Sequence, residues 1–283
     1  MNEYIDFHNR NLFVQTVIRV VINFSNKLNH RLFCLFWNTL LFLIRNSVRI
    51  SINDKYSFLI KDSSSQLIIG YKKRFEYYMQ SIKHRYDQLI DEYMLSEVEF
   101  ENDDIVIDCG ANIGEIYNAL KHNNSKEYSF SYYAFEPSKY EFSILNQNSK
   151  NLVEKPYALY SENTFKNFYL NGELADSSLE KSKESLDSIE VECIRLDSYF
   201  DKNEIIKLLK LEAEGSELDV LHGAKKILKN INYITADLGF ELENNTKNNL
   251  IEVNELLINN GFELIRSHKR WVFLYKNIKL TNR

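Results

Sequence analysis

The sequence predicts an α/β protein whose main domain is built on a mostly parallel sheet. Three observations carry this prediction. From residue 103 onward, short apolar runs alternate with helical patterns, as in a parallel sheet covered by helices. The run at 104–108 breaks directly into a glycine turn. The last two runs are separated by only a few residues, 267–270, and so short a turn permits only an antiparallel pair.

Seven strands and four helices are expected in this domain. The strands are assigned to residues 104–108, 130–136, 152–158, 207–212, 232–238, 262–266 and 271–276. The helices are assigned to residues 114–122, 138–149, 217–229 and 247–260. An insertion at 159–200 has alternating runs near 165–170 and 189–195, which predict an extra antiparallel element or a lid. One edge strand should run against the rest.

The first 50 residues form an apolar, basic segment that we expect to be helical. It carries six Lys or Arg residues and two acids, whereas the whole chain has a net charge of -5. Its best apolar window, residues 32–44, is shorter than the about 20 residues that a membrane-spanning helix needs. A break at 26–29 predicts two helices rather than one.

The partner of these helices stays open at this point. Their basic residues, with Trp37 and several phenylalanines, suit a helix in the interface of an anionic membrane. Amphipathic stripes more often face protein, so contact with the main domain or with a second subunit through residues 11–50 is the alternative. The first residues are acidic where a secretory signal would be basic. We expect a cytoplasmic protein, with peripheral attachment to the inner face of the membrane as one option.

A hairpin and a helix are expected between this segment and the main domain. Residues 48–60 alternate apolar and polar side chains around 53–55, which predicts a hairpin that caps one edge of the following domain. Residues 74–97 have helical spacing and should bury one face against the sheet. We therefore divide the chain into residues 1–50, 51–98 and 99–283.

Composition and missing motifs exclude several classes of protein. The net charge of -5 and pI near 5.8 give no reason to expect a nucleic-acid partner. Cys34, Cys109 and Cys193 lie far apart, so they indicate neither a disulfide framework nor a zinc site, and no metal ligands are assigned. P-loop, H-E-x-x-H and G-x-S-x-G motifs are absent from the sequence, which removes kinase-like, zinc-protease and serine-hydrolase functions.

The glycine turn after residues 104–108 predicts a cofactor-binding loop. Gly110 and Gly114 allow a ligand to approach the backbone, and the helix that follows directs its free N–H groups toward that ligand. Asp108 stands at the tip of the strand. Glu136 ends the next strand, where a carboxylate can accept both hydroxyls of a ribose.

Acidic residues around this turn favour a cationic ligand over a dinucleotide. A pyrophosphate would meet Asp108 and Glu115, and Asn112 interrupts the G-x-G-x-x-G spacing. S-adenosylmethionine carries a sulfonium, an ammonium group and a ribose, so it suits an acidic site on electrostatic grounds.

Four motifs, in this order, resemble those of the FkbM-type methyltransferases. They are DCGANIG at 108–114, AFEPS at 134–138, RLDS at 195–198, and KLEAEGSE at 210–217 with VLHGA at 220–224. The resemblance covers about residues 95–276 and implies a class I methyltransferase fold, S-adenosylmethionine as the donor, and O-methylation of a sugar or another metabolite. It also implies that Asp108, Gly110, Asn112 and Gly114 line the methionine end of the cofactor and that Glu136 holds the ribose. One departure is Glu212, where the family commonly has aspartate.

Glu212, Glu214 and Asp237 are the candidate catalytic residues. Clustered carboxylates can raise one another's pKa and supply a general base near neutrality, or they can bind a divalent cation through oxygen. Methyl transfer needs an aligned acceptor oxygen and removal of its proton, and Glu212 is the first choice for that base. Glu217 is as readily explained as a helix cap.

Tyr157 and Ala158 end the third predicted strand, where an adenine would stack, although a tyrosine in a tyrosine-rich chain is more often part of the core.

These assignments favour an S-adenosylmethionine-dependent O-methyltransferase that acts on a carbohydrate or glycoconjugate hydroxyl, as in polysaccharide biosynthesis. A nicotinamide-dependent oxidoreductase on the same kind of sheet and a non-catalytic cofactor-binding scaffold are the alternatives.

Overall fold

The computed structural model describes residues 12–123, 128–149, 155–170, 177–179, 187–239 and 249–280. The chain separates into two compact units, residues 1–82 and 83–283. The boundary falls inside the segment 51–98 that the sequence sets apart from the main domain.

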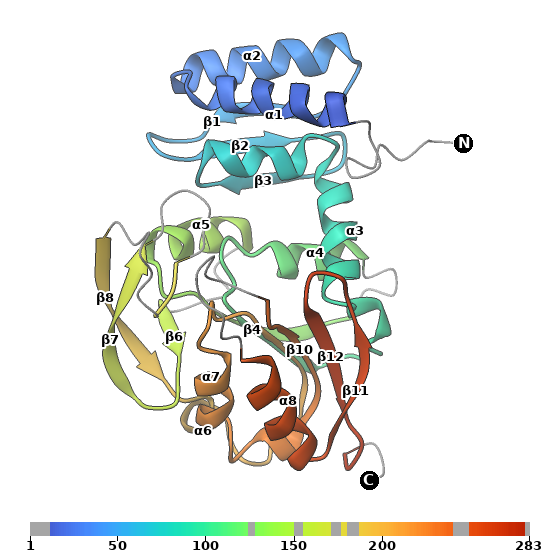
Figure 1. Cartoon of the computed structure of the whole chain (residues 1–283), viewed down its shortest axis with the longest axis vertical. Coiled ribbons are helices and arrows are strands. Elements are labelled where there is room, and N and C mark those ends of the chain that lie inside the picture. The colour runs from blue at the N-terminus through green and yellow to red at the C-terminus, as the bar shows by residue number, and fades with distance from the viewer. Residues whose placement is uncertain are drawn as a thin grey trace. The chain divides into compact units, whose positions relative to one another are not determined.

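The first unit combines two helices with a small antiparallel sheet (Figure 1). Its elements are α1 (Leu12–Asn26), α2 (His30–Leu43), β1 (Arg49–Ile52), β2 (Phe58–Lys61), β3 (Gln66–Ile69) and the 3-10 helix η2 (Lys72–Tyr78). Both the break between the helices and the β1–β2 hairpin are confirmed. The break forms because the Asn29 side chain accepts a hydrogen bond from the Leu32 N–H and caps α2.

Trp37 belongs to the core of this unit. It is 2% exposed, and its indole N–H donates to Ser25 Oγ on α1 over 3.1 Å. Its ring also lies edge-on to Phe33 and Phe75. The expectation that Trp37 contacts a membrane is therefore wrong. Within the described residues, we find no helix that has both the length and the apolar character required to cross a bilayer.

The helix expected at 74–97 is interrupted. After η2 the chain forms α3 (Ile82–Glu92) and the 3-10 helix η3 (Leu95–Glu97). The break forms because Asp62 accepts the Ile82 N–H over 2.8 Å, while the Asn46 side chain donates to the Met79 carbonyl over 2.8 Å. These side chains satisfy backbone groups that a continuous helix would have paired internally.

The second unit contains the expected mostly parallel sheet, with strand order β11-β12-β10-β9-β4-β5. Its strands are β4 (Asp104–Cys109), β5 (Phe130–Phe135), β9 (Ile206–Leu211), β10 (Ile231–Asp237), β11 (Phe262–Ser267) and β12 (Val272–Asn277). The first four are parallel, and β12 runs antiparallel to both of its neighbours. The strand that runs against the rest thus lies one place in from the edge strand β11.

The main sheet has six strands because the third expected strand belongs to another sheet. The described part of that strand, β6 (Tyr157–Leu159), pairs in parallel with β8 (Asp187–Ile194), and β8 pairs antiparallel with β7 (Thr164–Leu170). The insertion therefore contains the expected antiparallel element. Whether it also acts as a lid is untested, because 171–176 and 180–186 lie outside the described residues. Residues 152–154 of the expected strand lie outside them as well.

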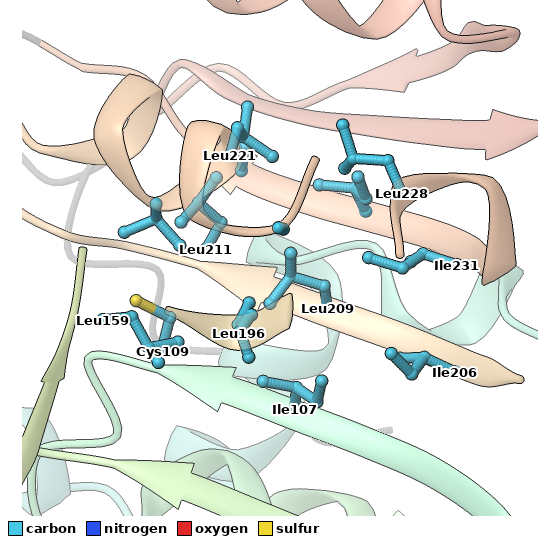
Figure 2. Close-up of a cluster of buried hydrophobic side chains, with 14 of the residues drawn as sticks. Ile107, Cys109, Leu159, Leu196, Ile206, Leu209, Leu211, Leu221, Leu228 and Ile231 are labelled. Carbon is cyan, nitrogen blue, oxygen red and sulfur yellow. The ribbon is translucent and has the colours of Figure 1, made fainter. Parts of the chain in front are cut away.

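The helices of this unit are α4 (Glu115–Asn123), α5 (Lys139–Ser149), α6 (Leu196–Tyr199), α7 (Glu217–Gly223), the 3-10 helix η5 (Leu228–Asn230) and α8 (Leu250–Asn259). The core cluster around β9 and β10 takes its helical side chains from α6, α7, η5 and α8. Figure 2 shows Leu221 and Leu228 facing Leu209 and Leu211 of β9. Both faces of a central parallel strand are buried, and four of the six residues of β9 are leucine or isoleucine. The other two are lysines: Lys207 is partly exposed and pairs with Asp104, whereas Lys210 is buried and belongs to the candidate site.

The helix expected at 217–229 ends early, at Gly223. A Cβ at this position would lie 2.0 Å from the carbonyl oxygen of Tyr160. Residue 223 can therefore lie against the Tyr160 backbone only as glycine. The 3-10 helix η5 begins after it, at Leu228.

Candidate active site

The glycine turn joins β4 to α4 and has an unusual backbone. Gly110 and Gly114 have φ angles of 73° and 83°, and Asn112 has a φ of 48°. A Cβ on Gly110 would lie 2.1 Å from the carbonyl oxygen of Glu212, so only glycine lets the turn pack against the end of β9. The buried Asn112 Oδ1 has no hydrogen-bond partner among the described residues. A buried acceptor of this kind suits the ammonium group of a ligand.

Glu136 follows β5 and lies directly beside this turn. Its two carboxylate oxygens accept the N–H groups of Asn112 and Ser138, each over 2.9 Å. Burial, assisted by the Glu141 carboxylate, raises the pKa of Glu136 to about 8, although these two hydrogen bonds oppose the shift. The sequence-based prediction that Glu136 lies beside the turn is therefore confirmed, and Glu136 fixes the backbone conformation at Asn112.

Lys210 lies at the centre of a buried polar chain below the turn. Its side chain is 1% exposed, and Nζ lies 3.2 Å from Asp108 Oδ1 and 2.7 Å from Glu212 Oε2. Nζ also donates to the carbonyl oxygens of Cys109 and Gly110, over 3.1 and 2.8 Å. Burial alone would lower the pKa of Lys210, but the two carboxylates outweigh it and raise the pKa. Lys210 therefore stays charged and ties β4, β9 and the turn together.

Asp108 supports the turn from inside the protein. It is 0% exposed, and besides Lys210 it accepts the hydroxyl of Tyr132 over 2.5 Å. The side chain of Asp108 therefore does not line a ligand surface in this conformation, in contrast to the expectation from the family resemblance. The reason is the buried ammonium group of Lys210 on the neighbouring strand β9, which pairs with the Asp108 carboxylate.

Glu212 is held as a carboxylate. Its side chain is 30% exposed, and Oε2 accepts the hydroxyl of Tyr93 over 2.7 Å as well as the Lys210 ammonium. Burial by itself would raise the pKa of Glu212, but the charge of Lys210 and these hydrogen bonds lower it below its usual value. The clustering of acids thus does not turn Glu212 into the near-neutral base that the sequence suggested.

Asp237 has the raised pKa instead. It ends β10, next to the end of β9 that Glu212 follows, because Ala236 pairs with Leu211 in the parallel register. Burial first, and then the negative charge of Glu212, raise the pKa of Asp237 to about 6. Gly239 N–H donates to Asp237 Oδ1 over 3.1 Å and orients the carboxyl group.

A series of ion pairs connects Arg270 to Glu115. Arg270 NH1 lies 3.0 Å from Glu92 Oε2, and Arg85 lies 3.6 Å from the same oxygen and 3.1 Å from Glu115 Oε1. Glu115 and Asp108 are therefore both paired with cations. The expectation that these two acids form an uncompensated rim that rejects a pyrophosphate is not supported by the geometry, so the choice of ligand depends on other observations.

The other two acids of the sequence motif have different positions. Glu214 has a φ of 49°, and its carbonyl oxygen accepts the Ser178 hydroxyl over 2.6 Å. Glu217 Oε1 accepts the N–H groups of Ala213 and Gly215, over 2.8 and 3.2 Å. Glu217 thus holds the turn that leads into α7, and both N–H groups that it accepts precede the helix, so it does not cap the helix as expected.

Tyr157 and Ala158 are on β6, outside the main sheet. Tyr157 is partly buried against the main core, and Ala158 is 4% exposed in the smaller core between β6, β7 and β8. Their predicted contact with an adenine remains a proposal.

Sequence reasoning assigned no role to Tyr93, Tyr132, Lys210 or Arg270. A lysine inside an apolar central strand is a signal for Lys210, since a buried ammonium group must have partners. For Tyr93 the sequence offers no such signal, because its partner Glu212 is more than a hundred residues away.

The match to a family model decides the class of enzyme. A model described as "Methyltransferase FkbM domain" matches residues 108–264, more than half of the chain. The chain belongs to the FkbM methyltransferase family. It is therefore a methyltransferase of the class I, Rossmann-like fold, and it requires a methyl donor. This result confirms the resemblance seen in the motifs and removes the oxidoreductase alternative.

Three more distant proteins to which the chain is similar are also named as methyltransferases or belong to solved structures with low similarity scores. The curated protein "Hexuronic acid methyltransferase AglP" of Haloferax volcanii is 27% identical over 184 residues, which is 60% of this chain and 72% of the relative. An rRNA methylase from Streptococcus thermophilus has a TM-score of 0.35 and 15% identity, over 67% of this chain and 93% of the other. TrmN from Thermus thermophilus has a TM-score of 0.36 and 11% identity, over 82% and 59%. At these scores the solved structures add nothing to the assignment.

Proposed function

We propose that this methyltransferase transfers the methyl group of S-adenosylmethionine to a hydroxyl of a carbohydrate, glycoconjugate or related metabolite. The observation that carries the proposal is a pair of carboxylates at the ends of the adjacent parallel strands β9 and β10, of which the one after β9 lies against the glycine turn. One of them, Glu212, has a lowered pKa, and the other, Asp237, has a pKa of about 6.

The residues of the turn fit the proposed donor. Gly110 and Gly114 leave the backbone open, Asn112 offers a buried acceptor for the ammonium group, and Glu136 offers a carboxylate for the ribose hydroxyls. Tyr157 and Ala158 are the candidates for contact with the adenine. S-adenosylmethionine supplies a methyl group on a sulfonium, which needs no further activation by the protein. Asp108 acts indirectly in this proposal, since it holds the turn through Lys210.

Asp237 is the proposed general base. A base works best when its pKa lies near the operating pH, and a pKa of about 6 meets that condition better than the lowered pKa of Glu212. Glu212 is assigned a positioning role, because Lys210 and Tyr93 fix its carboxylate. Its negative charge also raises the pKa of Asp237. Glu214 stays a weaker candidate.

The charge of the site favours a hydroxyl over a carboxylate as the acceptor. Among the described residues that form the ion pairs and carboxyl groups of the site, six are acids and three are cations: Asp108, Glu136, Glu212, Asp237, Glu92 and Glu115 against Lys210, Arg270 and Arg85. An acceptor carboxylate would meet this negative excess. A hydroxyl would not, and it needs the base that Asp237 supplies.

Calorimetry with S-adenosylhomocysteine tests the donor. We expect binding by the full chain and a loss of about tenfold to a hundredfold in affinity for Glu136→Ala, the range for a hydrogen bond to a charged group. Glu101→Ala, at an exposed position outside the site, is the matched control. Absence of binding by the full chain, or equal affinity for Glu136→Ala, would contradict the proposal.

The identity of the product tests the acceptor. Glycans are incubated with the enzyme and methyl-labelled donor, and the product is treated with mild alkali. A methyl ether on a hydroxyl survives this treatment, whereas a methyl ester on a uronic acid is hydrolysed. Label that is stable to alkali supports the proposal, and label that is lost to alkali assigns the enzyme to carboxylates. Donor binding without transfer to any glycan of the source cell would exclude a glycan as the acceptor.

A further inference from the structure

The helices of the first unit have two apolar faces. On α2, the face with Phe33, Trp37 and Leu41 is buried in the unit. Leu35 and Phe42 are on the opposite face and are 63% and 68% exposed. Thr39 is exposed beside them, so within the described part of the chain this face of α2 presents large apolar side chains to solvent.

The outer face of α1 has the same character. Val17, Val20 and Phe24 follow the i, i+3, i+7 spacing of one helix face, and they are 45%, 61% and 56% exposed. α1 lies beside α2 (Figure 1), and the rings of Phe24 and Phe36 pack edge-on with their centroids 6.1 Å apart. The exposed apolar side chains of the two helices are called the outer apolar face from here on.

The formal charges carried by α1, α2 and the residues between them are all positive. No acid occurs from residue 7 to residue 53, although the chain as a whole has a net charge of -5. Arg19, Lys27, Arg31 and Arg45 are exposed on the two helices or directly after them. In a symmetric dimer through this face, each of these cations would approach the cations of the second copy. The complementary partner is therefore anionic, and it must also accept apolar side chains.

We propose that the outer apolar face binds the surface of an anionic membrane, with α1 and α2 lying in the plane of the interface. Helices of 15 and 14 residues are about 20 Å long, which fits a position along the interface rather than across a hydrocarbon core of about 30 Å. The apolar side chains of this face enter the boundary between headgroups and acyl chains, and the arginines and Lys27 contact the phosphates. This inference does not depend on the proposed methyl acceptor.

Vesicle flotation of the full chain tests the proposal. The probes are phosphatidylcholine vesicles with and without about a third of phosphatidylglycerol, at about 0.1 M and about 0.5 M salt. We expect binding to the anionic vesicles at low salt and at least a tenfold loss on neutral vesicles or at high salt. The double variant Arg19→Gln/Arg31→Gln should bind about 25-fold more weakly, since each cation near the surface contributes about fivefold.

Substitutions of the apolar residues distinguish binding through this face from non-specific adsorption of exposed apolar side chains to vesicles. The triple variant Val20→Ser/Leu35→Ser/Phe42→Ser removes apolar side chains that are all more than half exposed, so folding should be retained, as checked by circular dichroism. It should no longer float. Ile251→Ser/Ile258→Ser on α8, at positions 67% and 52% exposed, is the matched control and should float like the wild type.

Three outcomes overturn the proposal. Equal binding to neutral and anionic vesicles, or none to either, removes the anionic membrane as the partner. Normal flotation of the triple variant moves the contact elsewhere. A dimer in sedimentation velocity that the triple variant dissociates, without vesicle binding by the wild type, makes the face a subunit interface instead.

Discussion

Replacement of Asp237 by asparagine should stabilise the protein and abolish its activity. Burial and the charge of Glu212 raise the pKa of Asp237 from 3.8 to about 6, so the folded state binds a proton more tightly than the unfolded chain. Stability therefore falls as the pH rises from about 4 to about 6, and the full deficit persists above that range. Asparagine has nearly the same shape, can still accept the Gly239 N–H, and carries no charge at any pH.

The size of the effect follows from the shift in pKa. Two pKa units correspond to about 3 kcal/mol at pH 8, of which only about 1 kcal/mol applies at pH 4.5, where the carboxyl group of the folded protein is mostly protonated. We expect Asp237→Asn to gain free energy of unfolding by up to these amounts, and the gain should be about 2 kcal/mol larger at pH 8 than at pH 4.5. Urea unfolding of the full chain at both pH values measures it.

Activity provides the second half of this test. With Asp237 as the base, the wild-type kcat/KM should rise with pH through about 6 and then level off, and Asp237→Asn should lose at least about a hundredfold. Asp187→Asn, at an exposed position on β8, is the matched control and should change the free energy of unfolding by no more than about 0.5 kcal/mol. A destabilised or fully active Asp237→Asn would refute the reasoning.

Three further predictions concern the turn and the chain of ion pairs. Gly110→Ala should lose at least about 2 kcal/mol of unfolding free energy, because its Cβ would meet the Glu212 carbonyl oxygen. Gly114→Ala should lose only about 1 kcal/mol, because its φ is 83° but its Cβ would make ordinary contacts. Urea unfolding measures both losses. Lys210→Met should cost about 3–5 kcal/mol by leaving Asp108 without its cation, and the double variant Lys210→Met/Asp108→Asn should recover part of that loss in the same assay. Binding of S-adenosylhomocysteine near pH 7 should release up to about one proton, because ribose hydroxyls stabilise the carboxylate form of Glu136, whose pKa is about 8 in the free protein. Calorimetry in two buffers of different ionisation enthalpy measures that proton, and Glu136→Gln should release none.

Much of the fold could be predicted because its signals are local. Apolar runs mark the strands, and the turn at residues 110–114 and the short turn before β12 each fix a connection. The place of β6 could not be predicted, because a strand of three residues reveals its residue pattern but not which neighbour takes its hydrogen bonds. The break before Ile82 depends on Asp62, a side chain from a different turn, and periodicity along the chain does not register such contacts.

The sequence by itself determined which acids stand at the ends of the parallel strands and that Glu136 lies beside the glycine turn. Those facts follow from the order of strands and turns. Only the tertiary structure decided how these acids are charged. Burial raises the pKa of Asp108 although Lys210 pairs with it, and Lys210 lowers the pKa of Glu212. Tyr93 reaches Glu212 from another part of the chain. A pKa depends on burial and on neighbours within a few ångströms, and folding alone brings those neighbours together.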